Sequence, residues 1–339
     1  MSRQPGLFET ATAAPPRRPA SGAGDVRPAR DSPLLEAPLL PVDIRLGTSS
    51  WFFPGWRGLV YDGVHPQVTL SRKGLEAYGQ IPLLRTVSLD RTFYAPISAV
   101  DYARYATQVP EQFSFIVKAP AIVCDAVMRN EEGRGKVPNP HFLDAVIATR
   151  EFVLPCLEGL EAKAGPLVFQ ISPLPRSLVE DASLFVERLE RFFAALSREI
   201  GPHRPLYALE LRNPELLTPR LMRMLARTGV RYCVGLHDRM PEVERQEAAL
   251  RALDGEEPGP LVVRWNLHRG FLYQAAKQRY EPFDRLVDED GETRRTLARM
   301  AAAAFKAGRK VWITANNKAE GSAPLSVLEL AREIAKLVT

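Results

Sequence analysis

The feature that most constrains this chain is an alternation of short apolar runs with amphipathic stretches, which begins at Ile44 and continues to the C-terminus. Each apolar run has the length of a β-strand and is followed by a stretch with helical spacing. The eight runs are IRLGTSSW (44–51), TVSLDRT (86–92), FSFIVKAP (113–120), LVFQISP (167–173), LYALELR (206–212), RYCVGLHD (231–238), LVVRWNL (261–267) and KVWITANN (310–317).

The stretches between the runs carry helix signals. In residues 181–200 the apolar side chains recur at helical spacing and share one face. The segment PELLTPRLMRMLARTG ends on Gly229, in the C′ position that helices favour. Residues 326–338 predict a last helix that closes the ring.

Eight strand–helix repeats over residues 43–339 predict an α/β fold, a (β/α)₈ TIM barrel. A doubly wound open sheet is the competing architecture. It usually has fewer strands and often a glycine-rich phosphate turn, whereas this sequence has neither GxGxxG nor GxxxxGK[ST]. We therefore predict the barrel.

Residues 1–42 differ in composition from the rest. They are rich in Pro, Ala and Arg and show no sustained periodicity. Such a segment buries too little apolar area to offset its chain entropy, so we predict a disordered tail. The start, MSRQPGLFET, lacks the layout of a secretory signal and no run of about 18 apolar residues follows. A cytoplasmic protein without membrane contact is expected.

The net charge and the cysteine content restrict which classes of function the chain can have. The formal net charge is +5, from 45 Lys and Arg against 40 Asp and Glu. This mild surplus permits an anionic partner, nucleic acid included, but does not demand one. Cys124, Cys156 and Cys233 are far apart, so we expect reduced thiols. Without HExxH, HxH or a set of three carboxylates, we predict neither a metal site nor a cofactor.

Polar residues at the strand ends are the candidates for function, because TIM-barrel sites form where strands end and βα-loops begin. Glu210 and Asp90 are the candidate catalytic carboxylates. The candidate ligand-binding residues are Lys118, Arg212, Arg264, Asn316, Asn317, Thr92, Tyr94, Trp51 and Gln170.

Alternation along a strand turns Glu210 and Arg212 to the same side. If that side is the barrel mouth, Lys118, Arg212 and Arg264 converge there and form a cradle for phosphate or carboxylate. The structural alternative is an ion network that pairs only with itself. The tandem amides Asn316 and Asn317 suit hydrogen bonding to a ligand, although turn geometry could explain one of them.

Two further motifs give weaker signals. His237 and Asp238 are neighbours on a predicted strand, so they cannot both point inward unless the chain bends there. The segment GTSSW has the wrong glycine spacing for a GxSxG nucleophile elbow, which argues against a serine hydrolase. Trp51 and Tyr94 could wall a pocket or simply pack at the rim.

Several segments in order resemble the DUF72 (YecE-like) family of barrel proteins of unknown function, from about Ile44 to the C-terminus. The matching pieces are LGTSSWFFPGWRGLVY (46–61), the triplet Thr92-Phe93-Tyr94, FSFIVKAP (113–120), GPLVFQISP (165–173), ALELRNP (208–214) and NNKAEGSAP (316–324). The resemblance implies the barrel independently. It also implies site roles for Glu210, Arg212, Arg264, Asn316, Asn317, Thr92 and Tyr94.

The chain departs from the family pattern at several polar positions. The family usually has Gly at the position of Ser50, Glu and Asn at those of Ser88 and Asp90, and His at that of Asn213. It usually has His-Gly where this chain has Asn266-Leu267, and His where this chain has Lys318. The loss of these groups implies either an altered specificity or a site that binds without catalysing.

Three hypotheses follow, of which the third is a barrel that serves only as a structural scaffold and binds no ligand. The first is an enzyme, such as a hydrolase or lyase, that acts on an anionic small molecule or phosphodiester, with Glu210 as acid or base. The second is a non-catalytic module that binds nucleic acid or a protein on a barrel with a degenerate active site, with an affinity that falls steeply with salt.

Overall fold

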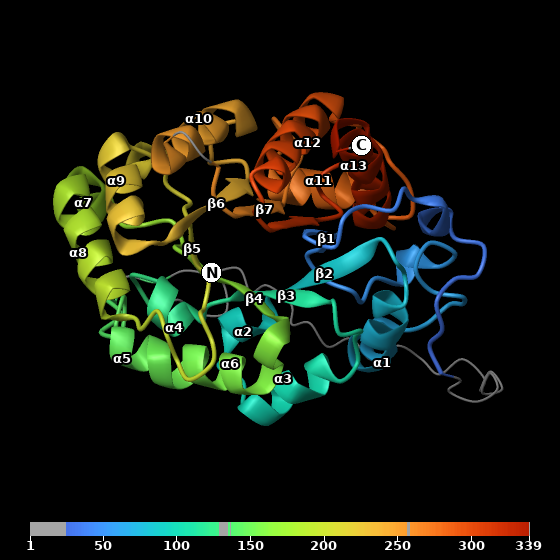
Figure 1. Cartoon of the computed structure of the whole chain (residues 1–339), viewed down its shortest axis with the longest axis horizontal. Coiled ribbons are helices and arrows are strands. Elements are labelled where there is room, and N and C mark those ends of the chain that lie inside the picture. The colour runs from blue at the N-terminus through green and yellow to red at the C-terminus, as the bar shows by residue number, and fades with distance from the viewer. Residues whose placement is uncertain (1–24, 129–134, 136, 256–257, 339) are drawn as a thin grey trace, which may run out of the picture.

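A closed parallel barrel forms the molecule in a computed structural model, which describes residues 25–128, 135, 137–255 and 258–338. The eight strands follow one another around the ring in chain order, and β8 pairs with β1. The helices lie outside the ring (Figure 1). The predicted TIM barrel is confirmed.

The strands are β1 (Ile44–Thr48), β2 (Leu84–Leu89), β3 (Ser114–Lys118), β4 (Ala164–Gln170), β5 (Tyr207–Glu210), β6 (Arg231–Leu236), β7 (Leu261–Trp265) and β8 (Val311–Ala315). Six of them lie within a predicted run, whereas β2 begins two residues before its run and β4 three residues before its run. Most runs continue a few residues beyond the strand, because their polar C-terminal ends already belong to the βα-loops.

The helices are α1 (Gln67–Gly79), α2 (Arg91–Tyr94), α3 (Ala99–Ala106), α4 (Ala121–Cys124), α5 (Ala145–Ala148), α6 (Leu154–Leu160), α7 (Arg176–Glu180), α8 (Ala182–Ala195), α9 (Pro219–Thr228), α10 (Val243–Asp254), α11 (Tyr273–Tyr280), α12 (Gly291–Lys306) and α13 (Ala323–Val338). The predicted end of α9 is confirmed, since Gly229 has φ +62° and its N–H bonds back to Ala226. Among the described residues, none of the helices combines the length and the apolarity that a membrane span requires.

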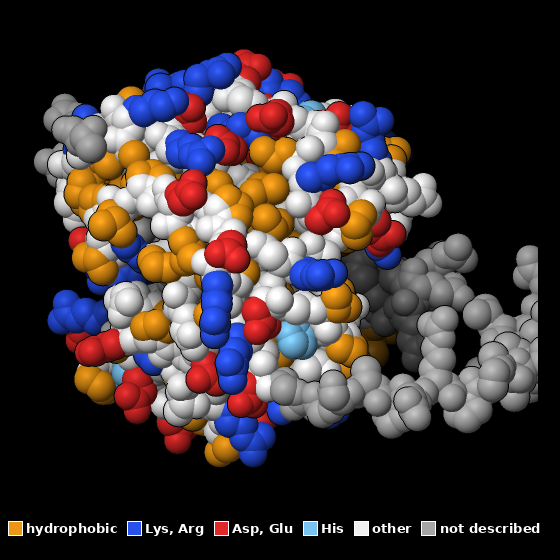
Figure 2. Space-filling view, turned by 90° about the vertical axis from the view of Figure 1, so that its right-hand side faces the viewer, with side chains coloured by type: hydrophobic (Ala, Val, Ile, Leu, Met, Phe, Trp, Pro, Cys, Tyr) orange, Lys and Arg blue, Asp and Glu red, His pale blue; other side chains and the backbone are white. Residues whose placement is uncertain are grey.

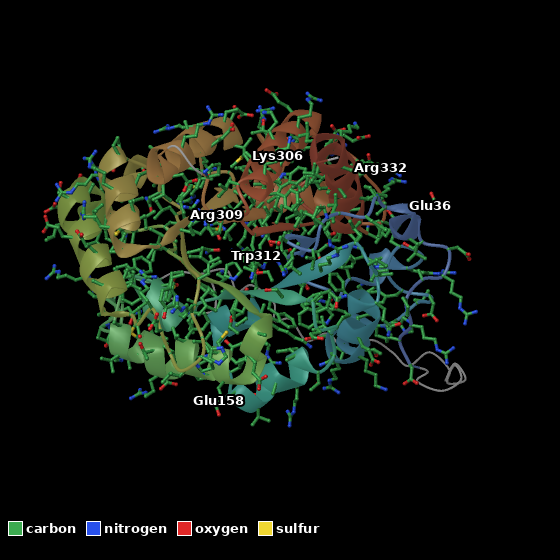
Figure 3. All side chains as sticks on the ribbon, in the orientation of Figure 1. Glu36, Glu158, Lys306, Arg309, Trp312 and Arg332 are labelled. Atoms are coloured by element: carbon green, nitrogen blue, oxygen red, sulfur yellow. The ribbon has the colours of Figure 1, made fainter. Side chains whose placement is uncertain are left out.

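A small apolar cluster made of strand residues fills the barrel interior. Its members are Ile116, Val168, Ala208, Cys233, Val262 and Trp312. Trp312 lies near the centre of the ring, whereas Glu158 and Arg332 lie on its outside (Figure 3). The larger apolar cluster packs the outer strand faces against the helices.

This interior layer explains where the polar residues point. Side chains alternate along a strand, so the residue two positions later faces the same way. On β3, β4, β5 and β7 that next inward residue is polar. These residues are Lys118, Gln170, Glu210 and Arg264. The apolar layer therefore forms the floor beneath a polar mouth.

The predicted disordered tail differs from the structure over residues 25–42. Leu34 is buried, and Ser32 caps a short 3₁₀-helix over Pro33–Glu36. The N–H of Ala29 bonds to the carbonyl of Val60. Backbone bonds and single apolar anchors hold this segment, and neither produces a periodic sequence signal. Residues 1–24 lie outside the described residues.

Replacing Leu34 with Ala tests whether this segment belongs to the folded body. Leu34 is 1% exposed, so we expect the free energy of unfolding to fall by about 2–4 kcal/mol in urea denaturation. Leu39→Ala is the matched control, because Leu39 is 86% exposed and its loss should cost less than about 0.5 kcal/mol. Equal small effects of both changes would contradict the packing described above.

Candidate active site

Arg264 is the centre of the polar mouth. Its buried guanidinium donates through Nη2 to both oxygens of Asp90 at 2.8 Å. Its Nη1 donates to Glu210 Oε2 at 2.6 Å and to Gln170 Oε1 at 3.0 Å. A planar guanidinium can join partners in this way because its donors diverge in fixed directions. Arg264 therefore ties β2, β4, β5 and β7 together at one level.

Arg212, two residues after Glu210, shares two of these partners. Its Nη2 forms an ion pair with Glu210 Oε1 at 2.7 Å and donates to Gln170 Oε1 at 3.1 Å. Its Nη1 is buried and has no hydrogen-bond partner among the described residues. The backbone leaves room for this arrangement at Gly235, where a Cβ would lie 3.0 Å from Glu210 Oε1.

The two carboxylates of the mouth are held ionised. Burial works against the charge of Glu210, yet Arg212 and Arg264 keep its pKa below the usual range. The pKa of Asp90 is also lowered, because Arg264 and Lys118 outweigh burial and Ser88 donates to Oδ1 at 2.6 Å. The Asp90 side chain is 37% exposed, so it can reach a ligand, whereas the Glu210 side chain is fully enclosed.

Lys118 is a buried cation without an ionic partner among the described residues. Its side chain is 8% exposed, and Nζ lies 3.5 Å above the centroid of the Phe93 ring. In the part of the chain that the structure describes, Nζ has no hydrogen bond and no ion pair. Burial lowers the pKa of Lys118 to about 8, with Asp90 opposing the shift and Arg264 adding to it. Lys118 is therefore mostly charged at neutral pH.

Thr92 and Tyr94 have different surroundings. The buried Thr92 hydroxyl donates to the carbonyls of Leu89 and Lys118, which fixes α2 against the end of β3. Thr92 thus supports Phe93 and Lys118 from beneath. Tyr94 projects outward and is 86% exposed. A ligand contact by either residue stays a prediction.

The tandem asparagines serve different purposes. Asn316 Nδ2 donates to Ser49 Oγ at 2.7 Å, which joins the ends of β8 and β1. The buried Asn317 accepts from Trp56 Nε1 at 3.1 Å and from the N–H of Ala323 at 2.9 Å. Asn317 therefore fixes the start of α13, and Asn316 is the amide that lies among the mouth residues.

Trp51 and Gln170 complete the predicted set. The Trp51 ring is buried and packs edge-on against Phe52 and Tyr105, with centroids 5.5 and 5.6 Å away. Gln170 Oε1 accepts from both mouth arginines, Arg212 and Arg264. In the structure Gln170 acts as a shared acceptor within the network, and Trp51 packs at the rim.

Lys318 belongs to this region although it was not among the predicted site residues. Its Nζ donates to Asn316 Oδ1 at 3.1 Å and lies 4.3 Å above the centroid of the Tyr273 ring. The sequence held one signal for it, since Lys318 follows Asn316 by two residues and replaces the histidine usual in the resembling family. Tyr273, on α11, had no signal, because its place depends on the long loop after β7.

His237 and Asp238 form a pair with each other at the end of β6. The strand ends at Leu236, so the strict alternation of a strand does not extend to this pair. Burial, followed by the charge of Arg212, lowers the pKa of His237 to about 4. His237 also lines a cavity of about 250 Å³ together with Asp238, His268 and Arg269. This cavity adjoins the mouth between the loops after β6 and β7.

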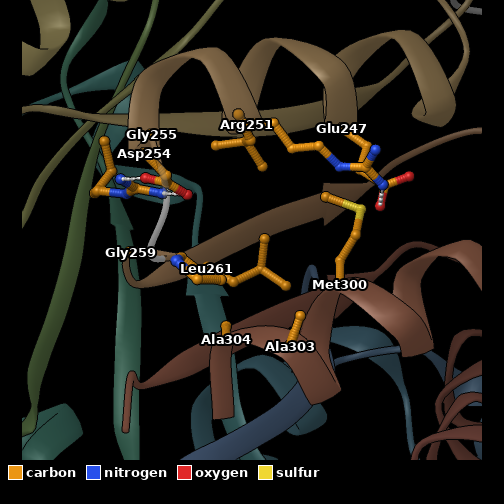
Figure 4. A pocket seen from close by; sticks show the side chains of 12 residues that line it. Glu247, Arg251, Asp254, Gly255, Gly259, Leu261, Met300, Ala303 and Ala304 are labelled. Atoms are coloured by element: carbon orange, nitrogen blue, oxygen red, sulfur yellow. Dashed lines mark hydrogen bonds and ion pairs between the residues drawn. The ribbon is translucent and has the colours of Figure 1, made fainter. Parts of the chain in front are cut away.

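A second cavity, of about 340 Å³, lies at the other end of the barrel (Figure 4). Arg231 and Leu261, the first residues of β6 and β7, line it together with Met300. Arg231 there forms an ion pair with Asp254. Since the N-terminal end of a barrel contributes to stability rather than catalysis, we do not assign the functional site to this cavity. In the described ranges no cluster of three or more His, Cys, Asp or Glu residues is placed to bind a metal.

Comparison with known proteins identifies the family. The model of the family described as "Protein of unknown function DUF72" matches residues 45–338. The chain belongs to the DUF72 family. The match spans all eight barrel strands except the first residue of β1, so the resemblance read from the sequence is confirmed. No curated protein matches the chain.

Two solved DUF72 structures resemble the fold. The protein from Thermotoga maritima is 18% identical with a TM-score of 0.56, over 86% of this chain and 99% of its own. The protein from Enterococcus faecalis is 18% identical with a TM-score of 0.53, over 87% of this chain and 95% of its own. At this identity they show the shared barrel.

Replacing Glu210 with Gln should lower the stability of the protein. Arg212 and Arg264 would lose their shared carboxylate in a buried place, so the free energy of unfolding should fall by about 3–5 kcal/mol at pH 7. Urea denaturation measures this. Glu215→Gln, at an exposed position of the same segment, should cost less than about 0.5 kcal/mol.

Wild type and Glu210→Gln also give a test that depends on pH. Because the folded pKa of Glu210 is depressed, its stabilising contribution is complete above the unfolded pKa of about 4.3 and is lost as pH falls through the folded pKa. The stability difference between wild type and Glu210→Gln should therefore shrink below about pH 4. A difference that stays constant down to pH 2.5 would refute the ionised pair.

Proposed function

We propose that the mouth of the barrel binds the phosphate or carboxylate group of a small ligand, with Arg212 and Lys118 contacting the anion. The observation that carries this proposal is a charge imbalance. Lys118, Arg212 and Arg264 meet only two carboxylates, Asp90 and Glu210, in the described mouth. One positive charge is left over, in a place largely removed from water.

The unused donors indicate where the anion would lie. Arg212 Nη1 has no partner among the described residues, and the same holds for Lys118 Nζ. Burying a cation without a partner costs several kcal/mol, and a bound anion would offset that cost. Asn266 Nδ2, on the loop after β7, is a further buried donor without a partner in the described chain. In this proposal they supply the hydrogen bonds to the bound anion.

Arg264 has a different role in this proposal. Both terminal nitrogens of its guanidinium already bond to Asp90, Glu210 and Gln170. Arg264 therefore orients the carboxylates, and these orient Arg212 toward the ligand. Such preorganisation lowers the entropic cost of binding. A ligand larger than a single anion would extend toward the cavity lined by His237 and His268.

A hydrolase or lyase on this barrel would use Asp90 rather than Glu210 for proton transfer. Asp90 is partly exposed, whereas both oxygens of Glu210 are engaged by arginines within a closed environment. A general acid or base must reach the proton that it moves. Asp90 is therefore the first candidate for the acid or base and Glu210 the second, and both remain residues of the proposed site.

On the side of the molecule that Figure 2 draws, the charge pattern does not suit nucleic acid. Nucleic acid requires a continuous basic surface. The face shown in Figure 2 carries Lys and Arg side chains interleaved with Asp and Glu. The unpaired positive charge lies instead inside the mouth, where it suits a single anionic group.

The first test is anion binding by an Arg212→Ala variant. Wild-type protein should bind inorganic phosphate and gain about 2.7 kcal/mol of stability at 100 times the Kd, measured by thermal shift and calorimetry. Arg212→Ala should weaken binding at least tenfold, because it removes the free guanidinium edge. Glu210 keeps its bond to Arg264 in this variant, so the fold should persist.

Arg204→Ala is the matched control, since Arg204 is exposed and pairs with Glu199. It should bind phosphate as wild type does. Equal phosphate affinity in wild type and Arg212→Ala would remove Arg212 from the site. A steep salt dependence of oligonucleotide binding that survives Glu210→Gln would favour the nucleic-acid module instead.

The affinity for sulfate should decrease as pH rises through about 8. Only the protonated Lys118 attracts the anion, and burial places its pKa at about 8 in the free protein despite the opposing charge of Asp90. Sulfate does not titrate in this range, so calorimetry from pH 6.5 to 9.5 reports the protein alone. A Lys118→Arg variant should bind sulfate with much less dependence on pH. An unchanged profile in that variant would exclude Lys118 as the titrating group.

A further inference from the structure

Lys318 is a second buried amine at the mouth, and its surroundings differ from those of Lys118. It is 5% exposed. Its Nζ lies 4.3 Å above the ring centroid of Tyr273 and 5.9 Å from that of Phe283. Within the described chain no carboxylate lies within ion-pair distance of Nζ. The amine is therefore enclosed by aromatic carbon rather than by negative charge.

One hydrogen bond fixes the direction of this amine. Nζ donates to Asn316 Oδ1 at 3.1 Å, and Asn316 is itself held by Ser49 at the end of β1. Tyr273, which covers the amine, is close enough to the mouth for the charge of Asp90 to contribute, after burial, to raising its pKa. Lys318 thus lies beside the proposed anion site without being part of it.

We propose that Lys318 is a nucleophile that forms a Schiff base with a ligand carrying a carbonyl group in addition to its anionic group. This rests on the proposed function, because Arg212 and Lys118 would hold the anion while Lys318 reaches the carbonyl carbon. A lysine becomes nucleophilic when an apolar pocket or a neighbouring cation favours its neutral form. Lys318 lies in such an apolar pocket, formed by the rings of Tyr273 and Phe283.

The electrostatics agree with the geometry. Burial, and after it the positive charge of Lys277, lowers the pKa of Lys318 to about 8, while Glu281 opposes the shift. The other groups that face the amine, Tyr273, Phe283 and Asn316, are uncharged at neutral pH. A substantial fraction of neutral amine therefore exists just above neutrality, as imine formation requires.

Lys318 fits this role better than Lys118 because of its position, since the pKa is about 8 for both lysines. Lys118 lies within the charged cluster, where Asp90, Glu210 and the mouth arginines all act on it, and this is where the anion would be held. Lys318 lies among the rings of Tyr273 and Phe283, and its amine is directed by Asn316. The two lysines therefore divide the tasks of holding the anion and attacking the carbonyl.

The chemical step balances without an oxidant or reductant. The Nζ lone pair forms a bond to the carbonyl carbon, and the former carbonyl oxygen takes up protons and leaves as water. The product is an iminium ion on Lys318. An adjacent C–C or C–H bond can then break with its electron pair moving to the iminium nitrogen, which is the chemistry of a lyase rather than a hydrolase.

Reductive trapping tests the proposal on the whole chain. The protein is incubated with pyruvate and sodium cyanoborohydride at pH 7.5, and peptide mapping by mass spectrometry locates the secondary amine. We expect the adduct on Lys318 to exceed that on exposed lysines such as Lys336 at least tenfold. Adducts spread evenly over surface lysines, or none on Lys318, would overturn the proposal.

Lys318→Arg is the informative variant, because it keeps the cation above Tyr273 and removes the primary amine. It should show no adduct at position 318 and no labelling of Lys118 in its place, whereas Lys336→Arg should label at Lys318 as wild type does. If Lys118 were the main site of labelling in wild-type protein, Lys118 would be the nucleophile and the proposal for Lys318 would be wrong. Urea denaturation checks that both variants are folded.

A neutral carbonyl probe separates this proposal from the proposed function. Faster trapping of pyruvate than of acetone, with the advantage lost in Arg212→Ala, supports both. Equal trapping of pyruvate and acetone on Lys318 supports the Schiff base and contradicts the anion site. Phosphate binding without any adduct on Lys318 supports the anion site and overturns the Schiff base.

Discussion

The buried guanidinium of Arg264 is the interaction on which the polar end of this barrel depends. It joins Asp90, Gln170 and Glu210, and so connects strands that are not neighbours in the ring. Such a network seldom adds net stability, because removing its charges from water costs about as much as their attraction returns. We infer that the barrel keeps it for the geometry that it imposes on the mouth. The apolar layer of Ile116 and Trp312 beneath it keeps water from entering below.

That geometry leaves cations with unused donors. Glu210 forms ion pairs with two arginines, so Arg212 Nη1 is left without a partner in the described chain, and Lys118 Nζ lies above the ring of Phe93. Lys318, just after β8, lies among aromatic rings and is held by Asn316. Both lysines have a lowered pKa, but their surroundings differ. In our proposals Lys118 attracts the anion and Lys318 supplies the amine. Perturbed groups gathered at one place are a physical indication of function.

Much of the fold and part of the site could be predicted from the sequence. The period-two pattern put Glu210 and Arg212 on one side of their strand, and the structure pairs them at the mouth. The segment around Leu34 could not be predicted, since its order depends on contacts with distant parts of the chain. Asn316 and Asn317 look equivalent in sequence, yet one joins strand ends and the other caps a helix. Tyr273 reaches Lys318 only through the path of the loop after β7, which no local pattern encodes.

The most direct measurement is a ¹⁵N-detected NMR titration of the lysine side chains in the free and the phosphate-saturated protein. Lys118→Arg and Lys318→Arg assign the two unusual signals. The account predicts a Lys118 pKa of about 8 in the free protein that rises when phosphate binds, because the anion stabilises the ammonium ion. A Lys118 pKa that is the same with and without phosphate would contradict an anion site built on Arg212 and Lys118.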